Sequence, residues 1–278
     1  MAVLIAGCGY VGSTLARALL AEGEAVYGLR RDPSKLPPGV VPVAADLGEL
    51  RQVRDALAPL LPSIDRLVYT ASADERSEGA YRRAYVDGLD HLLRVLEDAP
   101  LRRAVFTAST AVYGQAEGWV DETSPTQPRE FTGRILLEGE ARLRQAPCPG
   151  VSLRLGGIYG PGRTRLIAQV EAGTLGRDRW TNRIHRDDCA GALAALLRIE
   201  EPAPVYVGVD DAPTPLSEVA DFVAAELGVP PPSCLGPPTG KRCRNTRLRA
   251  VYRLRVPSYR EGYGPMVRGY RLGAEPAR

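Results

Sequence analysis

Short apolar runs alternate with segments whose apolar residues recur at helical spacing along the first 155 or so residues of the chain. A run of four to six apolar residues is typical of a buried strand, and apolar residues three and four apart are typical of a helix packed on one face. Strands that alternate with helices form a parallel sheet covered on both faces. We therefore predict an α/β fold with a doubly wound parallel sheet, with strands at 3–6, 25–29, 40–44, 65–70, 103–108 and 151–155 and helices at 13–20, 50–60, 76–96 and 133–145.

The pattern loosens after Gly156 into Gly-Pro turns, and the last third reads as a smaller lobe. Further helices are predicted at 164–174, 188–198 and 215–227, around an apolar strand at 205–209. We expect a nucleotide-binding domain of residues 1–160, to which 182–212 return, and a small C-terminal substrate lobe of 161–181 and 213–278.

Three glycines follow the first strand in a Gly-x-Gly-x-x-Gly pattern and lead directly into the first helix. Gly7 permits a tight turn, Gly9 lets the backbone approach a diphosphate, and Gly12 lets helix and strand pack closely. Tyr10 and Val11 begin the helix, and a helix start presents backbone N–H groups and a partial positive charge to a phosphate. This order predicts a Rossmann-type dinucleotide site, and the alternative is a glycine-rich turn that binds nothing.

Arg30 closes the second strand, with Arg31 behind it and Asp32 only after both. In dinucleotide folds an acid at the closing position binds the ribose 2′-hydroxyl, whereas arginine accommodates a 2′-phosphate. The arginines therefore favour NADP(H), with NAD(H) as the other option. The alternative is a solvated arginine pair with Asp32 facing away.

Asp46 and Leu47 follow the third strand, where a carboxylate can accept a hydrogen bond from the adenine amino group. An equally good interpretation of Asp46 is the N-cap of the next helix.

Composition narrows the class of protein. The chain of 278 residues has 44% hydrophobic and 25% charged residues, as ordinary globular proteins do. A net charge of +3 does not favour nucleic acid or a membrane surface as partner. The five cysteines lack metal-ligand spacing, and no apolar run approaches the roughly 18 residues of a membrane span. We expect a reduced, cytoplasmic protein without a metal site.

Several further motifs appear in the order known from one family. Together they resemble the extended short-chain dehydrogenase/reductases, the NAD(P)-dependent sugar-nucleotide epimerase/dehydratase group, and the C-terminal run resembles an atypical branch of it. The motifs are Ala45-Asp46-Leu47, Thr107-Ala108-Ser109-Thr110-Ala111-Val112-Tyr113-Gly114, Asp121-Glu122, Arg154-Leu155-Gly156-Gly157-Ile158-Tyr159-Gly160-Pro161-Gly162, Ile184-His185-Arg186-Asp187-Asp188, and the run from Asn245 to Gly262.

The resemblance implies that Ser109 polarises the substrate, and that Thr70, Ala71, Ser72, Gly156 and Ile158 join the cofactor site. It also implies a Tyr-x-x-x-Lys pair on the helix after residue 130, where tyrosine transfers a proton and lysine lowers its pKa. Alignment instead places Thr132 at the tyrosine and Leu136 at the lysine.

This departure is firm because the chain has only two lysines, Lys35 and Lys241. A threonine hydroxyl does not titrate near neutral pH, and losing a positioned acid/base costs roughly 10²–10⁴ in rate. Tyr159, or a bound water, is the candidate substitute.

For the other residues that could replace the missing tyrosine, a structural role is the stronger interpretation. Tyr159 and Tyr113 are expected as packing residues, and His185 as a group that orients a helix start. Tyr85 stands where the family usually has an asparagine. Trp119 and Trp180 are expected either to line a pocket or to pack in a lid or core.

The tail from residue 241 to 260 is rich in arginine, which suits a substrate diphosphate, with a solvated charged face as the alternative. We therefore predict an atypical NADP(H)-favouring oxidoreductase of epimerase/dehydratase type, acting on a small polar substrate that can be anionic. The alternative is a catalytically inactive NADP(H)-binding sensor or interaction protein. By analogy with the family, helices near 76–96 and 133–145 are expected to form a homodimer seam.

Overall fold

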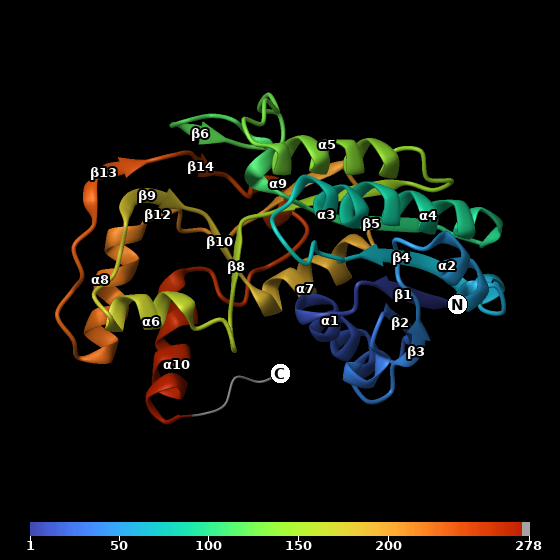
Figure 1. The fold of residues 1–278 in the computed structure, drawn as a ribbon, viewed down its shortest axis with the longest axis horizontal. Helices are drawn as coiled ribbons and strands as arrows, with labels where there is room; N and C mark the ends of the chain where they lie inside the picture. Colours follow the sequence, from blue (N-terminus) through green and yellow to red (C-terminus); the bar gives the residue numbers. More distant parts are fainter. Residues whose placement is uncertain (274–278) are drawn as a thin grey trace. The chain divides into compact units, whose positions relative to one another are not determined.

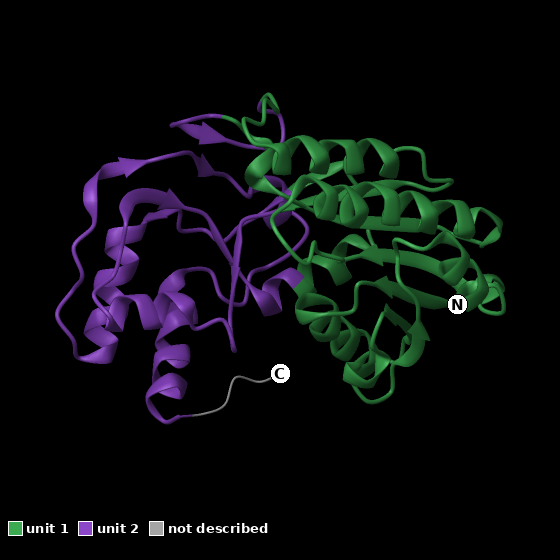
Figure 2. Cartoon of the chain, in the orientation of Figure 1, with its two compact units in different colours: residues 1–114, 125–154, 190–206 green, residues 115–124, 155–189, 207–278 purple. Residues whose placement is uncertain are grey.

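The structure, a computed structural model, describes residues 1–273. The chain forms two compact units (Figure 2). Unit 1 comprises residues 1–114, 125–154 and 190–206. Unit 2 comprises 115–124, 155–189 and the chain from Val207 on.

A seven-stranded parallel sheet confirms the predicted fold class. Its strand order is β11-β7-β5-β4-β1-β2-β3, so the chain winds outward from β1 in both directions (Figure 1). Every predicted strand is present, within two residues at each end. The bounds are β1 Ala2–Ala6, β2 Ala25–Arg30, β3 Val41–Ala44, β4 Ile64–Tyr69, β5 Arg103–Ser109, β7 Gly150–Leu155 and β11 Val205–Gly208.

The register brings the carboxyl ends of the central strands level. Ala6 of β1 pairs with Leu29 of β2 and with Tyr69 of β4, and Tyr69 pairs in turn with Phe106 of β5. All five residues of β1 are buried, as expected for a central strand covered on both faces. The loops that follow β1, β2, β4 and β5 therefore leave the sheet from one edge, where ligands of such folds bind.

The helices of unit 1 include two that lie side by side, α4 and α5 (Figure 1). The α-helices that begin in unit 1 are α1 Tyr10–Ala21, α2 Leu50–Leu57, α3 Glu78–Arg82, α4 Gly88–Val95 and α5 Phe131–Leu143, and the 3₁₀ turns are η1 Pro33–Lys35, η2 Leu61–Ser63, η4 Leu96–Asp98 and η5 Thr110–Val112.

The helix predicted over 76–96 is not continuous, which corrects the sequence-based expectation. A π-helical segment, η3 Arg83–Asp87, separates α3 from α4. The Tyr69 hydroxyl donates a 2.5 Å hydrogen bond to the carbonyl of Ala84, the group that would accept from Gly88 in an α-helix. A side chain that enters the ladder in this way disrupts the regular helix.

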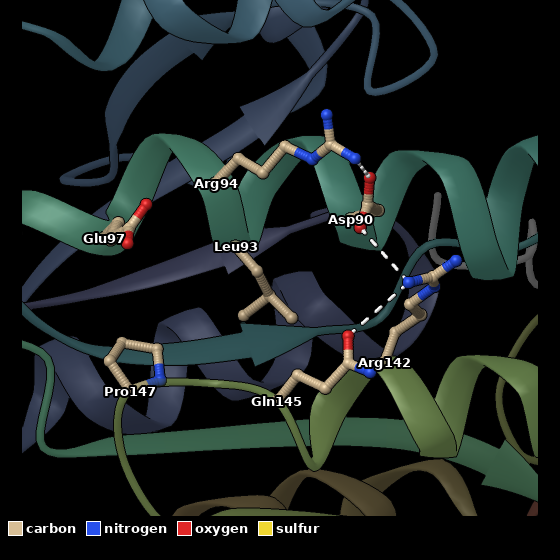
Figure 3. Close-up of a pocket in the computed structure, with 7 residues that line it drawn as sticks. All are labelled: Asp90, Leu93, Arg94, Glu97, Arg142, Gln145 and Pro147. Atoms are coloured by element: carbon tan, nitrogen blue, oxygen red, sulfur yellow. Dashed lines mark hydrogen bonds and ion pairs between the residues drawn. The ribbon is translucent and has the colours of Figure 1, made fainter.

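Helices α4 and α5 also line a cavity of about 330 Å³ (Figure 3). Asp90 pairs with Arg94 at 2.8 Å and with Arg142 at 4.0 Å, so these three charged groups of the cavity wall already form ion pairs. The homodimer expected along these helices stays a prediction.

Unit 2 contains small strands that the sequence pattern did not reveal, because two to five residues are too few to show alternation. They are β6 Trp119–Val120, β8 Gly157–Tyr159, β9 Arg177–Thr181, β10 Arg183–His185, β12 Thr214–Pro215, β13 Leu235–Thr239 and β14 Arg242–Cys243. The helices are α6 Arg165–Glu171, α8 Leu216–Leu227, α9 Thr246–Arg249 and α10 Tyr259–Arg271, with α7 Arg186–Leu196 beginning in this unit.

An apolar core gathers α6, α8 and α10 of unit 2. Tyr159 belongs to it, with its ring stacked on Tyr263 at 4.8 Å between centroids. Gly262 makes this packing possible, because a Cβ there would lie 2.3 Å from the Tyr159 ring.

Candidate cofactor and active site

The glycine turn between β1 and α1 has the geometry that the sequence motif predicts. Gly7 has φ +80°, and a Cβ on it would lie 2.4 Å from the backbone of Ala71. A Cβ on Gly12 would lie 2.9 Å from the Thr70 hydroxyl. These two glycines are therefore needed for the fold of the turn itself.

Gly9 differs from its two neighbours in the motif. A Cβ on Gly9 would have only the Gly7 carbonyl oxygen near it, at 3.8 Å, so the space in front of Gly9 is open. Gly9 is the N-cap of α1. Open space before the start of a helix, where the helix dipole is positive, suits a diphosphate.

The loop after β4 holds this turn in place. The Thr70 amide donates to the Ala6 carbonyl at 2.8 Å, and its hydroxyl donates to the Gly7 carbonyl at 3.0 Å. Ala71 contacts Gly7 from the same loop, and Ser72 is exposed beside it. The structure thus brings Thr70 and Ala71 to the glycine turn, with Ser72 next in the same loop, and their part in cofactor binding stays a prediction.

The two arginines after β2 have different surroundings. The Arg30 guanidinium donates to the Cys8 carbonyl at 3.1 Å, so it lies against the glycine turn. Arg31 is exposed and forms two hydrogen bonds with Asp74, of 2.8 and 2.7 Å. Of the pair, Arg30 is therefore the better placed for a phosphate beside the turn.

The carboxylate of Asp32 is used locally. It accepts from the Ser34 amide at 3.1 Å and from the Ser34 hydroxyl at 2.6 Å, which caps η1 and lowers the pKa of Asp32. A carboxylate engaged in this way is not oriented as a ribose ligand.

Asp46 does not cap α2, which corrects one of its two interpretations. The N-cap of α2 is Glu49, and its side chain makes no capping bond. Asp46 instead accepts from the Gly48 amide at 2.9 Å, in a tight turn after β3. The carbonyl of the following residue, Leu47, lies 3.0 Å from His91 Nδ1.

Ser109 and Thr132 come from segments that pack together. Ser109 ends β5, and its hydroxyl accepts from the Ala111 amide at 3.1 Å. Helix α5 packs against the turn after Ser109 so closely that a Cβ on Gly133 would lie 2.5 Å from the Ala111 carbonyl. Thr132 and Leu136 are buried on α5, at 7% and 4% exposure. No titratable side chain replaces the family's tyrosine and lysine at these two positions.

Tyr113 and Tyr85, the two candidate tyrosines of unit 1, have structural partners. Tyr113 is buried and accepts a 2.9 Å hydrogen bond from Arg154. Tyr85 packs edge-on against Phe106, at 6.4 Å between centroids, and burial raises its pKa.

A buried ion pair links α5 to β7 and was not foreseen from the sequence. Arg154 donates to both carboxylate oxygens of Glu140, at 2.8 and 2.7 Å, and both residues are at most 5% exposed. The signal that could have revealed it is a charged residue within the apolar stripe of a predicted helix.

In unit 2, Tyr159 and His185 have structural partners. The Tyr159 hydroxyl donates to the Ser258 carbonyl at 3.1 Å, and burial raises its pKa far above the usual range. His185 Nδ1 accepts from the Asp187 amide at 3.3 Å at the start of α7, which confirms the helix-orienting role. Burial lowers the His185 pKa.

Gly156 and Ile158, which the family resemblance places at the cofactor, come shortly before Tyr159 in the chain. A Cβ on Gly156 would lie 2.6 Å from the Asn182 carbonyl, and Ile158 pairs with Ile184 in the β8–β10 ladder.

Asp210 is a buried carboxyl near Arg183 that the sequence did not single out. It is 1% exposed, Oδ2 has no hydrogen-bond partner among the described residues, and burial raises its pKa to about 8. Since its pKa in the unfolded chain is about 3.9, the folded state favours the protonated form. Its contribution to stability is thus greatest below pH 4 and falls as the pH rises toward 8.

We expect Asp210→Asn to be more stable than the parent protein by a margin that grows from pH 5 to pH 8. Urea unfolding at several pH values measures this margin. Asp211→Asn is the control, since Asp211 is partly exposed and pairs with Arg249. A margin that does not change with pH would contradict the assignment.

The described residues contain no group of three or more His, Cys, Asp or Glu that could hold a metal. None of their helices has the length and apolar character needed to cross a membrane.

The fold and the glycine turn define a nucleotide-binding α/β protein, and comparison with known proteins gives its family. Residues 3–201 match the NAD dependent epimerase/dehydratase family. The chain therefore belongs to the NAD-dependent epimerase/dehydratase family, as the motifs had indicated, and this is a family of enzymes that use a nicotinamide cofactor.

Three similar proteins illustrate the range of the family. Protein YeeZ of Escherichia coli K12 is 34% identical over 217 residues, which cover 73% of this chain and 76% of YeeZ. A 3-diazoavenalumate denitrifying reductase of a Streptomyces species is 29% identical over 95% of this chain and 99% of its own. A solved structure from Methylobacillus flagellatus, described as an NAD-dependent epimerase/dehydratase, has 38% identity and a TM-score of 0.85, with 97% of this chain and 98% of the other covered.

Proposed function

We propose that this protein is an NADP(H)-dependent oxidoreductase that acts on a small polar substrate without a side-chain proton donor of the usual Tyr-x-x-x-Lys type. The observation that carries the proposal is the open space at Gly9, where α1 begins, with the Arg30 guanidinium against the same turn. The diphosphate of the cofactor would bind the N–H groups of this turn. When bound, the nicotinamide supplies or accepts hydride.

The cofactor preference follows from Arg30. Its position against the glycine turn suits a 2′-phosphate, whereas Arg31 is held by Asp74 and Asp32 is held by Ser34. A hydrogen-bonded charge pair is worth about 1.5–3 kcal/mol, which corresponds to roughly 10- to 100-fold in affinity.

We expect Arg30→Ala to weaken NADPH binding by about 10- to 100-fold and to leave NADH binding almost unchanged. Calorimetric titration of both cofactors measures this. Arg31→Ala is the matched control, with an effect of about threefold or less, because Asp74 already holds that side chain. Equal losses for NADPH and NADH would contradict the 2′-phosphate assignment.

The proton-transfer step is proposed to use water and Ser109. Ser109 is the last residue of β5, at the carboxyl edge of the sheet, and its hydroxyl can donate a hydrogen bond to a substrate oxygen. Thr132 does not titrate near neutral pH, and the Tyr159 hydroxyl is bonded to Ser258 with a raised pKa. We therefore assign the proton to a bound water and not to the Tyr159 hydroxyl, which is engaged with Ser258.

Ser109→Ala tests this step, and we expect it to lower NADPH turnover by about 10²-fold or more, as loss of an oxygen-polarising donor does. The assay is NADPH oxidation with whichever carbonyl substrate of a panel the parent protein reduces. Tyr159→Phe should retain turnover, since its hydroxyl donates to the Ser258 carbonyl and takes no part in the proposed step. Turnover that is lost in Tyr159→Phe, with fold and NADPH affinity intact, would assign the proton to Tyr159 instead.

The reductase interpretation draws support from one relative, the 3-diazoavenalumate denitrifying reductase, which matches nearly the whole chain. No comparison supports the inactive sensor considered from the sequence.

A further inference from the structure

A cluster of two tryptophans and two arginines in unit 2 has no part in the site described above. We name Trp119, Trp180, Arg242 and Arg244 the indole–guanidinium cluster. The guanidinium carbon of Arg242 lies 4.8 Å from the ring centroid of Trp119 and 4.8 Å from that of Trp180. The guanidinium of Arg244 lies 5.1 Å from the Trp119 centroid.

Backbone pairing fixes the cluster in place. Strand β14 pairs with β6, with Arg242 opposite Trp119 in the register, and the Arg242 amide donates to the Gly118 carbonyl at 2.8 Å. Trp180 comes from the neighbouring strand β9. Strands β6, β9 and β14 are labelled in Figure 1.

The positive charge of the cluster is not neutralised by the described part of the chain. No Asp or Glu occurs from residue 227 to residue 260, a stretch with eight Lys and Arg. Arg249 pairs with Asp211, and Arg260 with Glu218, at 3.2 and 3.5 Å. Neither Arg242 nor Arg244 forms an ion pair with any described carboxylate. Arg242 Nε is buried and has no hydrogen-bond partner among the described residues.

The aromatic rings and the arginines without a carboxylate partner together have the chemistry of a ligand-binding site. Rings that lie against a guanidinium leave its N–H donors, which point outward in its own plane, available for a planar oxyanion. Two such donors match the two oxygens of a carboxylate. Trp119 is 46% exposed, so part of its indole is open to solvent beside these donors, and aromatic rings pair edge to face as well as stacked.

We propose that the indole–guanidinium cluster binds the carboxylate of an aromatic acid, with the ring of the ligand against an indole and its carboxylate on Arg242. This proposal goes beyond the proposed function, because it assigns a ligand class to a cluster of unit 2 that takes no part in the cofactor site. It differs from the diphosphate that the family resemblance implies for the arginine-rich tail.

The protein offers a direct reporter for the test. Trp119 and Trp180 are the only two tryptophans in the sequence, so intrinsic tryptophan fluorescence comes entirely from the cluster. Full-length protein is titrated with benzoate, with neutral benzamide and with UDP, and each apparent affinity is checked by calorimetry. NADPH is titrated separately on the same preparations.

We expect saturable binding of benzoate, at least tenfold weaker binding of benzamide, and at least tenfold loss of benzoate affinity in Arg242→Lys, which keeps the charge and removes the fork. Arg249→Gln is the control for charge in the same tail, with a loss of about twofold or less. Thermal melting of Arg242→Lys shows whether the fold is kept, and Arg244→Gln, which is exposed, gives a second variant with a smaller expected loss.

Three outcomes would overturn the proposal. The first is the absence of saturable benzoate binding. The second is an equal loss of benzoate affinity in Arg242→Lys and in Arg249→Gln. The third is UDP binding that is tighter than benzoate binding and depends on Arg242, which would assign the site to a nucleoside diphosphate. NADPH affinity should be unchanged in Arg242→Lys. Failure of NADPH to bind the parent protein would count against the proposed function, separately from the benzoate result.

Discussion

Replacing Glu140 by glutamine is expected to lower the free energy of unfolding by about 3–5 kcal/mol, one of the largest effects that a single substitution in this chain should have. Glu140 is 1% exposed and holds Arg154 through two hydrogen bonds. Removing the negative charge leaves the Arg154 guanidinium buried and uncompensated. Denaturant unfolding measures the loss, and the midpoint of thermal unfolding should fall by roughly 10 °C.

The same helix supplies a matched control for Glu140. Glu138 also pairs with an arginine through two hydrogen bonds, to Arg82 at 2.8 and 3.0 Å, but this pair is nearly half exposed. Glu138→Gln should therefore cost about 1 kcal/mol or less. Replacing Glu140 and Arg154 together by apolar residues should cost less than Glu140→Gln alone. Equal effects of Glu138→Gln and Glu140→Gln would refute the role of burial.

Gly9→Ala is expected to reduce NADPH affinity by about 100-fold or more while the stability of the fold stays within about 1 kcal/mol of the parent. The added Cβ would have only the Gly7 carbonyl oxygen near it, at 3.8 Å, so the protein itself has room for it. The methyl group would instead occupy the space in which the diphosphate approaches the backbone. Calorimetry measures the affinity and thermal melting the stability.

Gly7→Ala is the companion variant that should behave differently. Its Cβ would lie 2.4 Å from the backbone of Ala71 at a φ of +80°, so this substitution should destabilise the protein as well as weaken NADPH binding. Unchanged NADPH affinity in Gly9→Ala would show that the diphosphate does not bind at this turn.

The central sheet could be predicted from the sequence because its strands are buried on both faces. Strands such as β1, with five buried residues in succession, leave continuous apolar runs that periodicity detects. The glycine turn was predictable for a related reason, since only glycine meets the steric demands at Gly7.

Contacts between residues distant in the chain could not be predicted in the same way. Arg31 and Asp74 are 43 residues apart, and Glu140 and Arg154 lie on different elements, so no local pattern tells which residues pair. Glu140 within the apolar stripe of its helix indicates a buried charge but not its partner. The π-helical segment depends on a hydrogen bond from Tyr69 to Ala84 that helical periodicity does not encode. The expectation for Tyr159 rested on motif alignment, whereas its hydroxyl partner, Ser258, is 99 residues away.

The loss of the Tyr-Lys pair is the feature that sets this chain apart from the pattern of its family. Thr132 and Leu136 are buried on a well-formed helix, so their positions are part of the packing. The glycine turn, in contrast, has close contacts at Gly7 and open space at Gly9. This contrast favours an enzyme that retains its cofactor and obtains its proton from water.

Calorimetric titration of the unmodified protein with NADPH and with NADH, at one fixed salt concentration, tests this account most directly. We predict one binding site per chain for NADPH, with NADH bound about 10-fold or more weakly because Arg30 has no phosphate to contact. Absence of binding by either dinucleotide would contradict the account.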